Sequence, residues 1–239
     1  MTELLDAIGR VTTPTLTTQL LKGWGLRNMA VRGVAPVNPQ AARFAGPAYT
    51  VRYLPLREDI PAMQQLDHPD NLLRRLVEEA PPGSVVVIDA GGRSDVGLLG
   101  DILTVRLKAR GVAGVVTDGG MRDLVELRQI PFPIFCAPTP APPPSFAALM
   151  PADVQRPVCC GGVTIVPSDV IVADADGVVV VPAALVERVA GAGLEQDRLE
   201  AYIRRRVERG EPIPGLYPPT EAVRDAYRRW VEAGEPEDL

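Results

Sequence analysis

The feature that most constrains the fold is a repeated pattern in the middle of the chain, where short apolar runs end at paired glycines. Residues 84–89 and 113–118 are valine-rich runs closed by Gly-Gly, and a third short run follows at 133–136. Runs of this length bounded by glycine are typical of strands buried on both faces. Helices are predicted between them, at about Asp101–Arg110 and Asp123–Gln129. Strand and helix alternating at this spacing indicates parallel β-α-β units and therefore an α/β fold.

Segments on either side of this core carry further elements. Thr13–Trp24 is predicted to be a helix, because a Thr-Pro pair opens it and glycines follow it. Proline accumulates in residues 138–144 and predicts an irregular loop. Gly191 and Gly193 leave open whether the charged segment Leu185–Arg209 forms one helix or two. The other expected elements are a strand at Phe44–Tyr53, a charged surface excursion at Arg57–Asp70, a helix at Asn71–Ala80, three short strands within 162–182 and a last helix near Thr220–Ala233.

The composition limits the classes of function. The chain has 239 residues, and its 25 basic and 30 acidic side chains give a formal net charge of −5. This balance offers no basic surface to nucleic-acid phosphates or anionic lipid. No apolar stretch approaches the roughly 18 residues that span a bilayer, and the acidic start does not resemble a signal peptide. We expect a cytoplasmic protein with one domain over residues 1–239, including a helical extension from about residue 211, that binds neither nucleic acid nor membrane.

The first candidate site is the tetrapeptide Gly100-Asp101-Ile102-Leu103, where a helix is expected to begin. Backbone N–H groups in the first turn of a helix lack internal partners and, with the helix dipole, form a natural cradle for a carboxylate or phosphate. Gly100 allows a ligand to approach the backbone closely. The alternative is structural, with Asp101 as a helix cap and Gly100 as a turn residue.

The second candidate site is Arg122-Asp123, which follows the Gly-Gly pair after a buried strand. Ligands of α/β proteins gather at the carboxyl ends of parallel strands. The carboxylate is suited to a hard divalent cation, which usually retains several waters. The guanidinium, which is always charged, suits an oxygen on which negative charge develops. A surface ion pair or a capped helix is the alternative.

Taken together, the two segments resemble a known family. Asp101, twenty intervening residues and Arg122-Asp123 are similar to the D-x20-R-D signature of the 4-hydroxy-4-methyl-2-oxoglutarate aldolase family, which shares its fold with the regulator of ribonuclease activity A, RraA. The resemblance covers about residues 10–210. It implies a swivelling β/β/α-type single domain with a parallel β-α-β core and C-terminal helices. Further similar stretches are Arg43–Ala48, Gly111–Val116 and Asp174–Pro182.

The resemblance also implies roles for individual residues. The amides of Ile102 and Leu103 would hold the carboxylate of a pyruvate-like unit, next to Gly100 and Asp101. Arg122 would contact the keto oxygen and stabilise the enolate that forms when the carbon–carbon bond breaks. Asp123 would ligate Mg²⁺ or Mn²⁺, while Asp101 would hold a water that serves in proton transfer. A metal and an arginine are a reasonable electron sink for this chemistry.

The function expected from this resemblance is that of a carbon–carbon lyase. A divalent-metal-dependent aldolase or decarboxylase would cleave a small 2-oxo acid, either a 4-hydroxy-2-oxo acid or oxaloacetate, and release pyruvate. The alternatives are a non-catalytic regulator that binds a ribonuclease and a sugar-acid lyase or hydratase of the same fold. The resemblance further implies a homotrimer or homohexamer, with an acidic residue supplied by a neighbouring subunit, for which Asp197 and Glu200 are candidates.

Several parts of the chain depart from the family pattern. They are the charged excursion at 57–70, the proline-rich loop at 138–144 and the extra C-terminal helix. Any of them would reshape the pocket, so the sequence does not specify the substrate beyond its 2-oxo acid end.

Other conspicuous residues are interpreted as structural. The single histidine, His68, is expected to be a solvated loop side chain. The three cysteines do not form a disulfide framework, and Cys159-Cys160 is expected to be a buried pair. Asp174 and Asp176 are explained by a turn at Gly177. The arginines at 204–206 are expected to lie on a solvated helix face, paired with the glutamates at 200 and 208.

Overall fold

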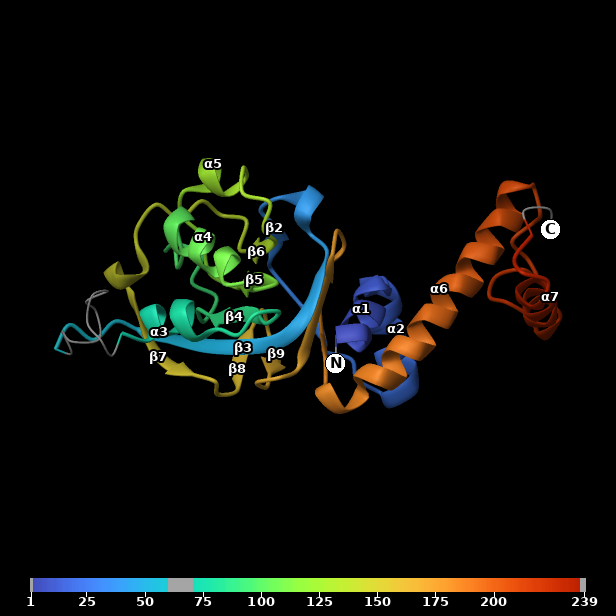
Figure 1. The fold of residues 1–239 in the computed structure, drawn as a ribbon, viewed down its shortest axis with the longest axis horizontal. Helices are drawn as coiled ribbons and strands as arrows, with labels where there is room; N and C mark the ends of the chain where they lie inside the picture. Colours follow the sequence, from blue (N-terminus) through green and yellow to red (C-terminus); the bar gives the residue numbers. More distant parts are fainter. Residues whose placement is uncertain (1, 60–70, 237–239) are drawn as a thin grey trace.

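A mixed β-sheet lies at the centre of the molecule (Figure 1), whose computed structural model describes residues 2–59 and 71–236. The valine-rich runs form two fully buried strands at its centre. Four strands run parallel side by side, in the order β3 (Phe44–Pro55), β4 (Val85–Asp89), β5 (Gly114–Thr117) and β6 (Ile134–Cys136). The predicted parallel β-α-β core is confirmed.

Antiparallel strands extend the sheet on both sides. The hairpin of β10 (Val170–Asp174) and β11 (Gly177–Val181) pairs with the first half of β3, and β7 (Leu149–Val154) pairs with its second half. No strand was expected at β7, whose sequence includes Pro151; an edge position tolerates a proline because it needs no ladder donor there. The remaining strands are β1 (Ala30–Val31), β2 (Ala35–Pro36) and the separate hairpin of β8 (Val158–Cys160) with β9 (Val163–Ile165).

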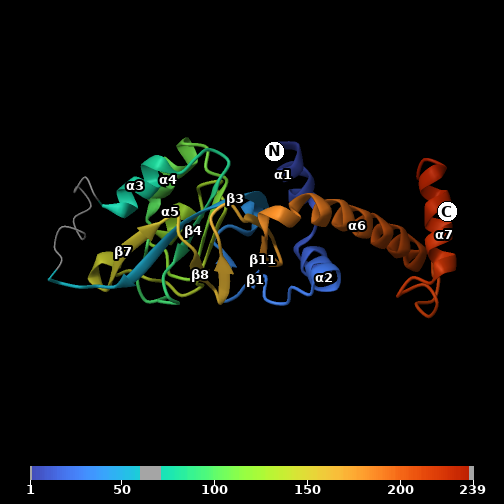
Figure 2. The same cartoon turned by 90° about the horizontal axis from the view of Figure 1, so that it is seen from below.

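Helices cover the sheet in two groups. One face packs against α3 (Leu72–Glu79), α4 (Asp101–Ala109) and α5 (Leu124–Leu127), with a continuous apolar core between them. The β8–β9 hairpin packs on the opposite face. A second group, formed by α1 (Thr2–Arg10), α2 (Thr13–Trp24) and α6 (Val186–Glu208), packs on β10 and β11 (Figure 2). Helix α1 was not expected from the sequence. A helix this short is stabilised mainly by tertiary packing, here by burial of residues such as Ile8 against this group, and so gives a weak local signal.

Helix α6 is continuous, which answers the question left open by its two glycines. Its second half extends away from the sheet and carries α7 (Glu221–Glu232) at its far end (Figure 1). The two helices share a small aromatic core that includes Tyr202, Tyr227 and Trp230. None of the described helices combines the length and apolar character that a bilayer crossing requires.

The two glycines of α6 provide a matched test of helix packing. A Cβ atom at Gly193 would lie 2.6 Å from Val11 Cγ1, whereas one at Gly191 would meet nothing within 4 Å. We expect Gly191→Ala to raise the free energy of unfolding by about 0.5–1 kcal/mol, because alanine restricts the unfolded chain and favours the helix. We expect Gly193→Ala to lower it by roughly 1–3 kcal/mol through overpacking. Urea unfolding of both variants measures the difference, and equal shifts would contradict this packing.

Candidate functional site

The two candidate segments meet because they leave adjacent parallel strands at the same edge of the sheet. The chain after β4 and the chain after β5 then continue side by side, joined by backbone hydrogen bonds. Leu98 N–H donates to Gly120 O at 3.0 Å, and Arg122 N–H donates to Leu99 O at 2.9 Å. The 143–145 loop joins from the other side, where Ser145 N–H donates to Gly97 O at 3.0 Å. Three loops therefore fix the backbone on which the predicted residues stand.

Two glycines of the first segment make room for the two charged residues of the second. A Cβ atom at Gly97 would lie 2.1 Å from Arg122 Cγ, and one at Gly100 would lie 2.3 Å from Asp123 Oδ2. Neither position tolerates a larger residue without moving the charged side chain. A glycine is therefore needed at position 100 to make room for Asp123, in addition to the ligand approach expected from the sequence. Gly97, which makes room for Arg122 in the same way, was not identified by the sequence analysis.

Asp123 combines an unusual backbone with an exposed carboxylate. Its φ of 56° places it in the left-handed region, which costs a non-glycine residue of order 1 kcal/mol and is tolerated best by Asn and Asp. The Asp101 N–H donates to Asp123 Oδ2 over a long 3.4 Å. The carboxylate therefore stands at the N-terminus of α4, where the helix dipole favours negative charge.

The N-terminus of α4 lies where the sequence predicts it. Gly100 is the residue before the helix, and its carbonyl accepts from Thr104 N–H at 3.2 Å. Ile102 N–H donates to Asp101 Oδ1 at 2.8 Å, so a ligand carboxylate bound by this amide would replace that bond. Leu103 lines a cavity beside the helix.

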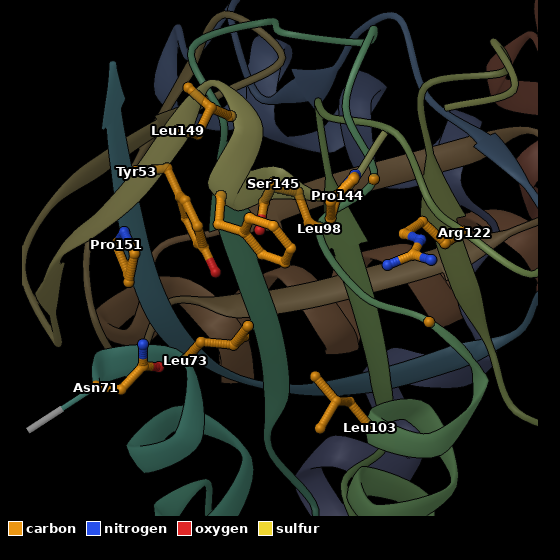
Figure 3. A pocket seen from close by; sticks show the side chains of 13 residues that line it. Tyr53, Asn71, Leu73, Leu98, Leu103, Arg122, Pro144, Ser145, Leu149 and Pro151 are labelled. Atoms are coloured by element: carbon orange, nitrogen blue, oxygen red, sulfur yellow. The ribbon is translucent and has the colours of Figure 1, made fainter. Parts of the chain in front are cut away.

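This cavity of about 110 Å³ lies between Arg122 and β3 (Figure 3). The Arg122 guanidinium points into it from one side. Gly97 and Gly100 also line the cavity. Pro144, the last residue of the proline-rich loop, also lines the cavity. The loop therefore contributes one residue to the wall of this cavity.

The oxygen donors at the site fit a hard divalent cation held largely by water. Over residues 2–59 and 71–236, no three His, Cys, Asp or Glu side chains gather into a complete metal cage. Magnesium commonly binds through one or two carboxylates and keeps several waters. The exposed Asp123 carboxylate, with Asp101 next to it across the loop, supplies that kind of incomplete oxygen set.

A methyl group at Gly100 provides a direct test of this geometry. In Gly100→Ala the new Cβ would collide with Asp123 Oδ2, so we expect the carboxylate to be displaced and Mn²⁺ affinity to fall by about tenfold. Gly23→Ala is the matched control, because nothing lies within 4 Å of a Cβ at that helical position. Calorimetric titration with Mn²⁺ measures the change, and unaltered affinity in Gly100→Ala would contradict a metal role for Asp123.

Other acidic residues singled out in the sequence serve the packing of the terminal helices. Asp174 accepts from Thr13 N–H at 2.8 Å and from Asp176 N–H at 3.0 Å, as the predicted turn requires. Asp197 accepts from Thr12 N–H at 2.9 Å and so ties α6 to the start of α2. Glu200 accepts from Gln196 at 2.6 Å, where a pairing with the arginine cluster was expected. The predicted solvated position of His68 falls outside the described residues, as do residues 60–70 of the charged excursion.

A second hollow lies between Asp89, Asp118 and Cys159, on the β8–β9 side of the same sheet edge. Its carboxylates are occupied by the protein's own backbone. Asp89 Oδ2 accepts from Cys159 N–H at 2.9 Å, and Asp118 accepts from Ala90 N–H at 2.8 Å and Gly92 N–H at 3.0 Å. Burial raises the pKa of Asp118, and these amides oppose that shift. Asp89 and Asp118 therefore connect the loops that follow β4 and β5 to neighbouring backbone segments through hydrogen bonds.

The expectation that Cys159 and Cys160 are both buried is wrong for one of them. Cys160 is buried, but Cys159 is exposed because alternate residues of β8 face opposite sides. Burial raises the pKa of Cys136 to about 11 and that of Cys160 well above its usual value. We expect one thiol per native chain to react rapidly with a disulfide reagent at pH 8, and three after denaturation. Cys159→Ser removes the rapid phase; rapid reaction of two thiols would contradict the assignment.

Comparison with known proteins agrees with this fold. A model of the RraA-like family, described as Aldolase/RraA, matches residues 1–180. The chain is 36% identical over 166 residues to a Halalkalibacterium halodurans protein provisionally named 4-hydroxy-4-methyl-2-oxoglutarate aldolase, covering 69% of this chain and 71% of that protein. It is 33% identical over 141 residues to the Thermus thermophilus 4-hydroxy-4-methyl-2-oxoglutarate aldolase, covering 59% and 77% of the two chains.

Solved structures agree with this family assignment. Streptomyces coelicolor RraAS2, described as an unusual member of the RNase ES inhibitor RraA family, superposes with a TM-score of 0.75 at 32% identity. That comparison covers 84% of this chain and 96% of the other. An uncharacterised Pseudomonas syringae protein superposes with a TM-score of 0.78 at 27% identity, covering 90% and 93%. The chain therefore belongs to the RraA-like family.

Proposed function

We propose that this protein is a divalent-metal-dependent carbon–carbon lyase that cleaves a small 2-oxo acid and releases pyruvate. The observation that carries the proposal is the placement of Arg122 and Asp123 beside the N-terminus of α4, each packed against a glycine of the facing loop. The names of the Halalkalibacterium and Thermus relatives support an aldolase. Decarboxylation of oxaloacetate belongs to the same proposal because both reactions leave an enolate.

Each residue of the candidate site has a distinct role in the proposed reaction. The amides of Ile102 and Leu103 bind the substrate carboxylate, assisted by the helix dipole. The Arg122 guanidinium stabilises the charge that develops on the keto oxygen as the bond breaks. Asp101 Oδ1 accepts the Ile102 N–H in the free protein; its second oxygen, Oδ2, orients the water that exchanges a proton with the substrate.

Asp123 would hold Mg²⁺ or Mn²⁺. When bound, the cation acts as a Lewis acid that polarises the 2-oxo group. Asp123 is suited to this task because its carboxylate is exposed over Gly100 and its backbone carbonyl accepts from Leu127 N–H at 2.9 Å in α5.

Pyruvate release tests the proposal. The assay uses 4-hydroxy-2-oxo acids, oxaloacetate and longer 2-oxo sugar acids, with and without Mg²⁺ or Mn²⁺. We expect turnover that depends on the metal and is lost on chelation. Turnover of the sugar acids alone would favour the sugar-acid lyase or hydratase, and no turnover of any substrate would refute the lyase proposal.

The similarity to RraAS2 favours a second candidate, a protein that binds a ribonuclease and regulates it. Inhibition of a ribonuclease E-type enzyme by this protein, without pyruvate release from any substrate, would establish that candidate instead. For either function we propose a homotrimer or homohexamer, which light scattering of the purified protein would distinguish from a monomer.

A further inference from the structure

The cavity beside Arg122 is not confined to the N-terminus of α4 but continues toward β3 and α3. It reaches from Arg122 to Tyr53 on β3 and Leu73 on α3 (Figure 3). Its volume of about 110 Å³ is several times the roughly 10–15 Å³ that one water needs. The part of the substrate that lies beyond the 2-oxo acid end therefore has a defined compartment.

The compartment is mostly apolar, and Tyr53, Asn71 and Ser145 are the uncharged polar residues that line it. Arg122, at the end nearest the reaction site, is the one charged side chain among the described residues that line it. A second carboxylate placed in the far part would lie against apolar walls and gain no cation from the described residues that line it, which is unfavourable. The apolar side chains that line the cavity are those of Leu73, Leu98, Leu103, Pro144, Phe146, Leu149 and Pro151.

One polar atom in this compartment lacks a partner. The Tyr53 hydroxyl is fully buried and makes no hydrogen bond of normal geometry with the described residues, and the side chain points into the cavity (Figure 3). Buried hydroxyls in native proteins are nearly always hydrogen-bonded. Burial raises the pKa of Tyr53, and the neighbouring Ser145 side chain opposes that shift. The hydroxyl thus keeps its proton and can donate to a ligand that displaces its contact with Ser145.

From these observations we infer the substrate class, an inference that rests on the proposed lyase function. The substrate carries its only carboxylate at the 2-oxo acid end, and its uncharged tail lies along the apolar compartment and accepts a hydrogen bond from Tyr53. A hydroxyl or carbonyl oxygen on that tail fits the donor. Dicarboxylic acids such as oxaloacetate are poorer substrates than 4-hydroxy-2-oxo acids with such a tail.

Equilibrium binding tests the compartment separately from turnover. The probes are 2-oxo acids of increasing length, each made in three forms that end in a methyl group, a hydroxyl or a carboxylate, titrated calorimetrically with Mg²⁺ present. At every length we expect the carboxylate form to bind at least about tenfold more weakly than the methyl form. At the length that reaches Tyr53 the hydroxyl form binds about tenfold more tightly than the methyl form.

The Tyr53→Phe variant assigns that preference to one atom. The advantage of the hydroxyl form over the methyl form is expected to disappear in Tyr53→Phe. It is expected to persist in Tyr49→Phe, a control on the same strand that is likewise buried but does not line the cavity. The ligand series on the unaltered protein decides the question of charge even if a variant were to unfold.

The outcomes separate this inference from the function on which it rests. Equal or tighter binding of the carboxylate forms, or a hydroxyl preference that survives in Tyr53→Phe, would overturn the inference. Pyruvate release from dicarboxylic acids alone would overturn it while leaving the lyase function intact. Preferential binding of uncharged tails without any pyruvate release would support the compartment and refute the lyase.

Discussion

Replacing Asp123 by asparagine is expected to lower the kcat/KM of pyruvate release by about 10³-fold. Asparagine has nearly the same shape as aspartate and tolerates the left-handed backbone that this position adopts, with φ at 56°. The packing against Gly100 is therefore retained. What is lost is the negative charge that would hold the divalent cation, and a neutral amide oxygen is a weak substitute for it.

Two measurements make the Asp123→Asn result specific. Mn²⁺ affinity, determined by calorimetry, is expected to fall together with activity, while the thermal unfolding midpoint stays close to that of the parent. Glu126→Gln is the matched control, because it removes one exposed carboxylate from α5 without altering a residue of the cavity. Full metal-dependent activity in Asp123→Asn would eliminate the proposed metal position.

Replacing Arg122 by lysine is expected to lower kcat by about 10²–10³-fold, with a smaller change in KM. The charge is kept, but lysine lacks the planar fork that can address a carboxylate and a keto oxygen together. Arg122 is positioned by its own backbone bond to Leu99 O and by the space over Gly97, so a shorter or rounder head group would not reach the same point. An effect concentrated in kcat indicates an interaction gained mainly in the transition state.

Arg128→Lys controls for the general effect of exchanging these two cations. Arg128 is exposed at the end of α5 and does not line the cavity, so its replacement should leave both kinetic constants unchanged. If Arg122→Lys raised KM while leaving kcat intact, Arg122 would be a ground-state binding residue and the assignment to enolate stabilisation would be wrong.

The sequence was sufficient for elements whose stability is local or whose pattern is strongly periodic. Helix α2 begins and ends at the predicted residues, and the valine-rich runs at β4 and β5 form the predicted parallel pair. Helix α1 and strand β7 could not be predicted in the same way. Helix α1 depends on burial against α6 and the sheet, while β7 is recruited by the exposed edge of β3 despite its proline.

By itself, the sequence determined the α/β class, the family and the two segments of the candidate site. A fixed spacing between Asp101 and Arg122-Asp123 is visible along the chain, because each segment follows one strand of a β-α-β unit. Only the tertiary structure decided that Gly97 and Gly100 make room for Arg122 and Asp123, and that Tyr53 faces Arg122 across a cavity. The reason is physical: close approach and an unpaired buried hydroxyl depend on atoms far apart in sequence, and no local periodicity records them.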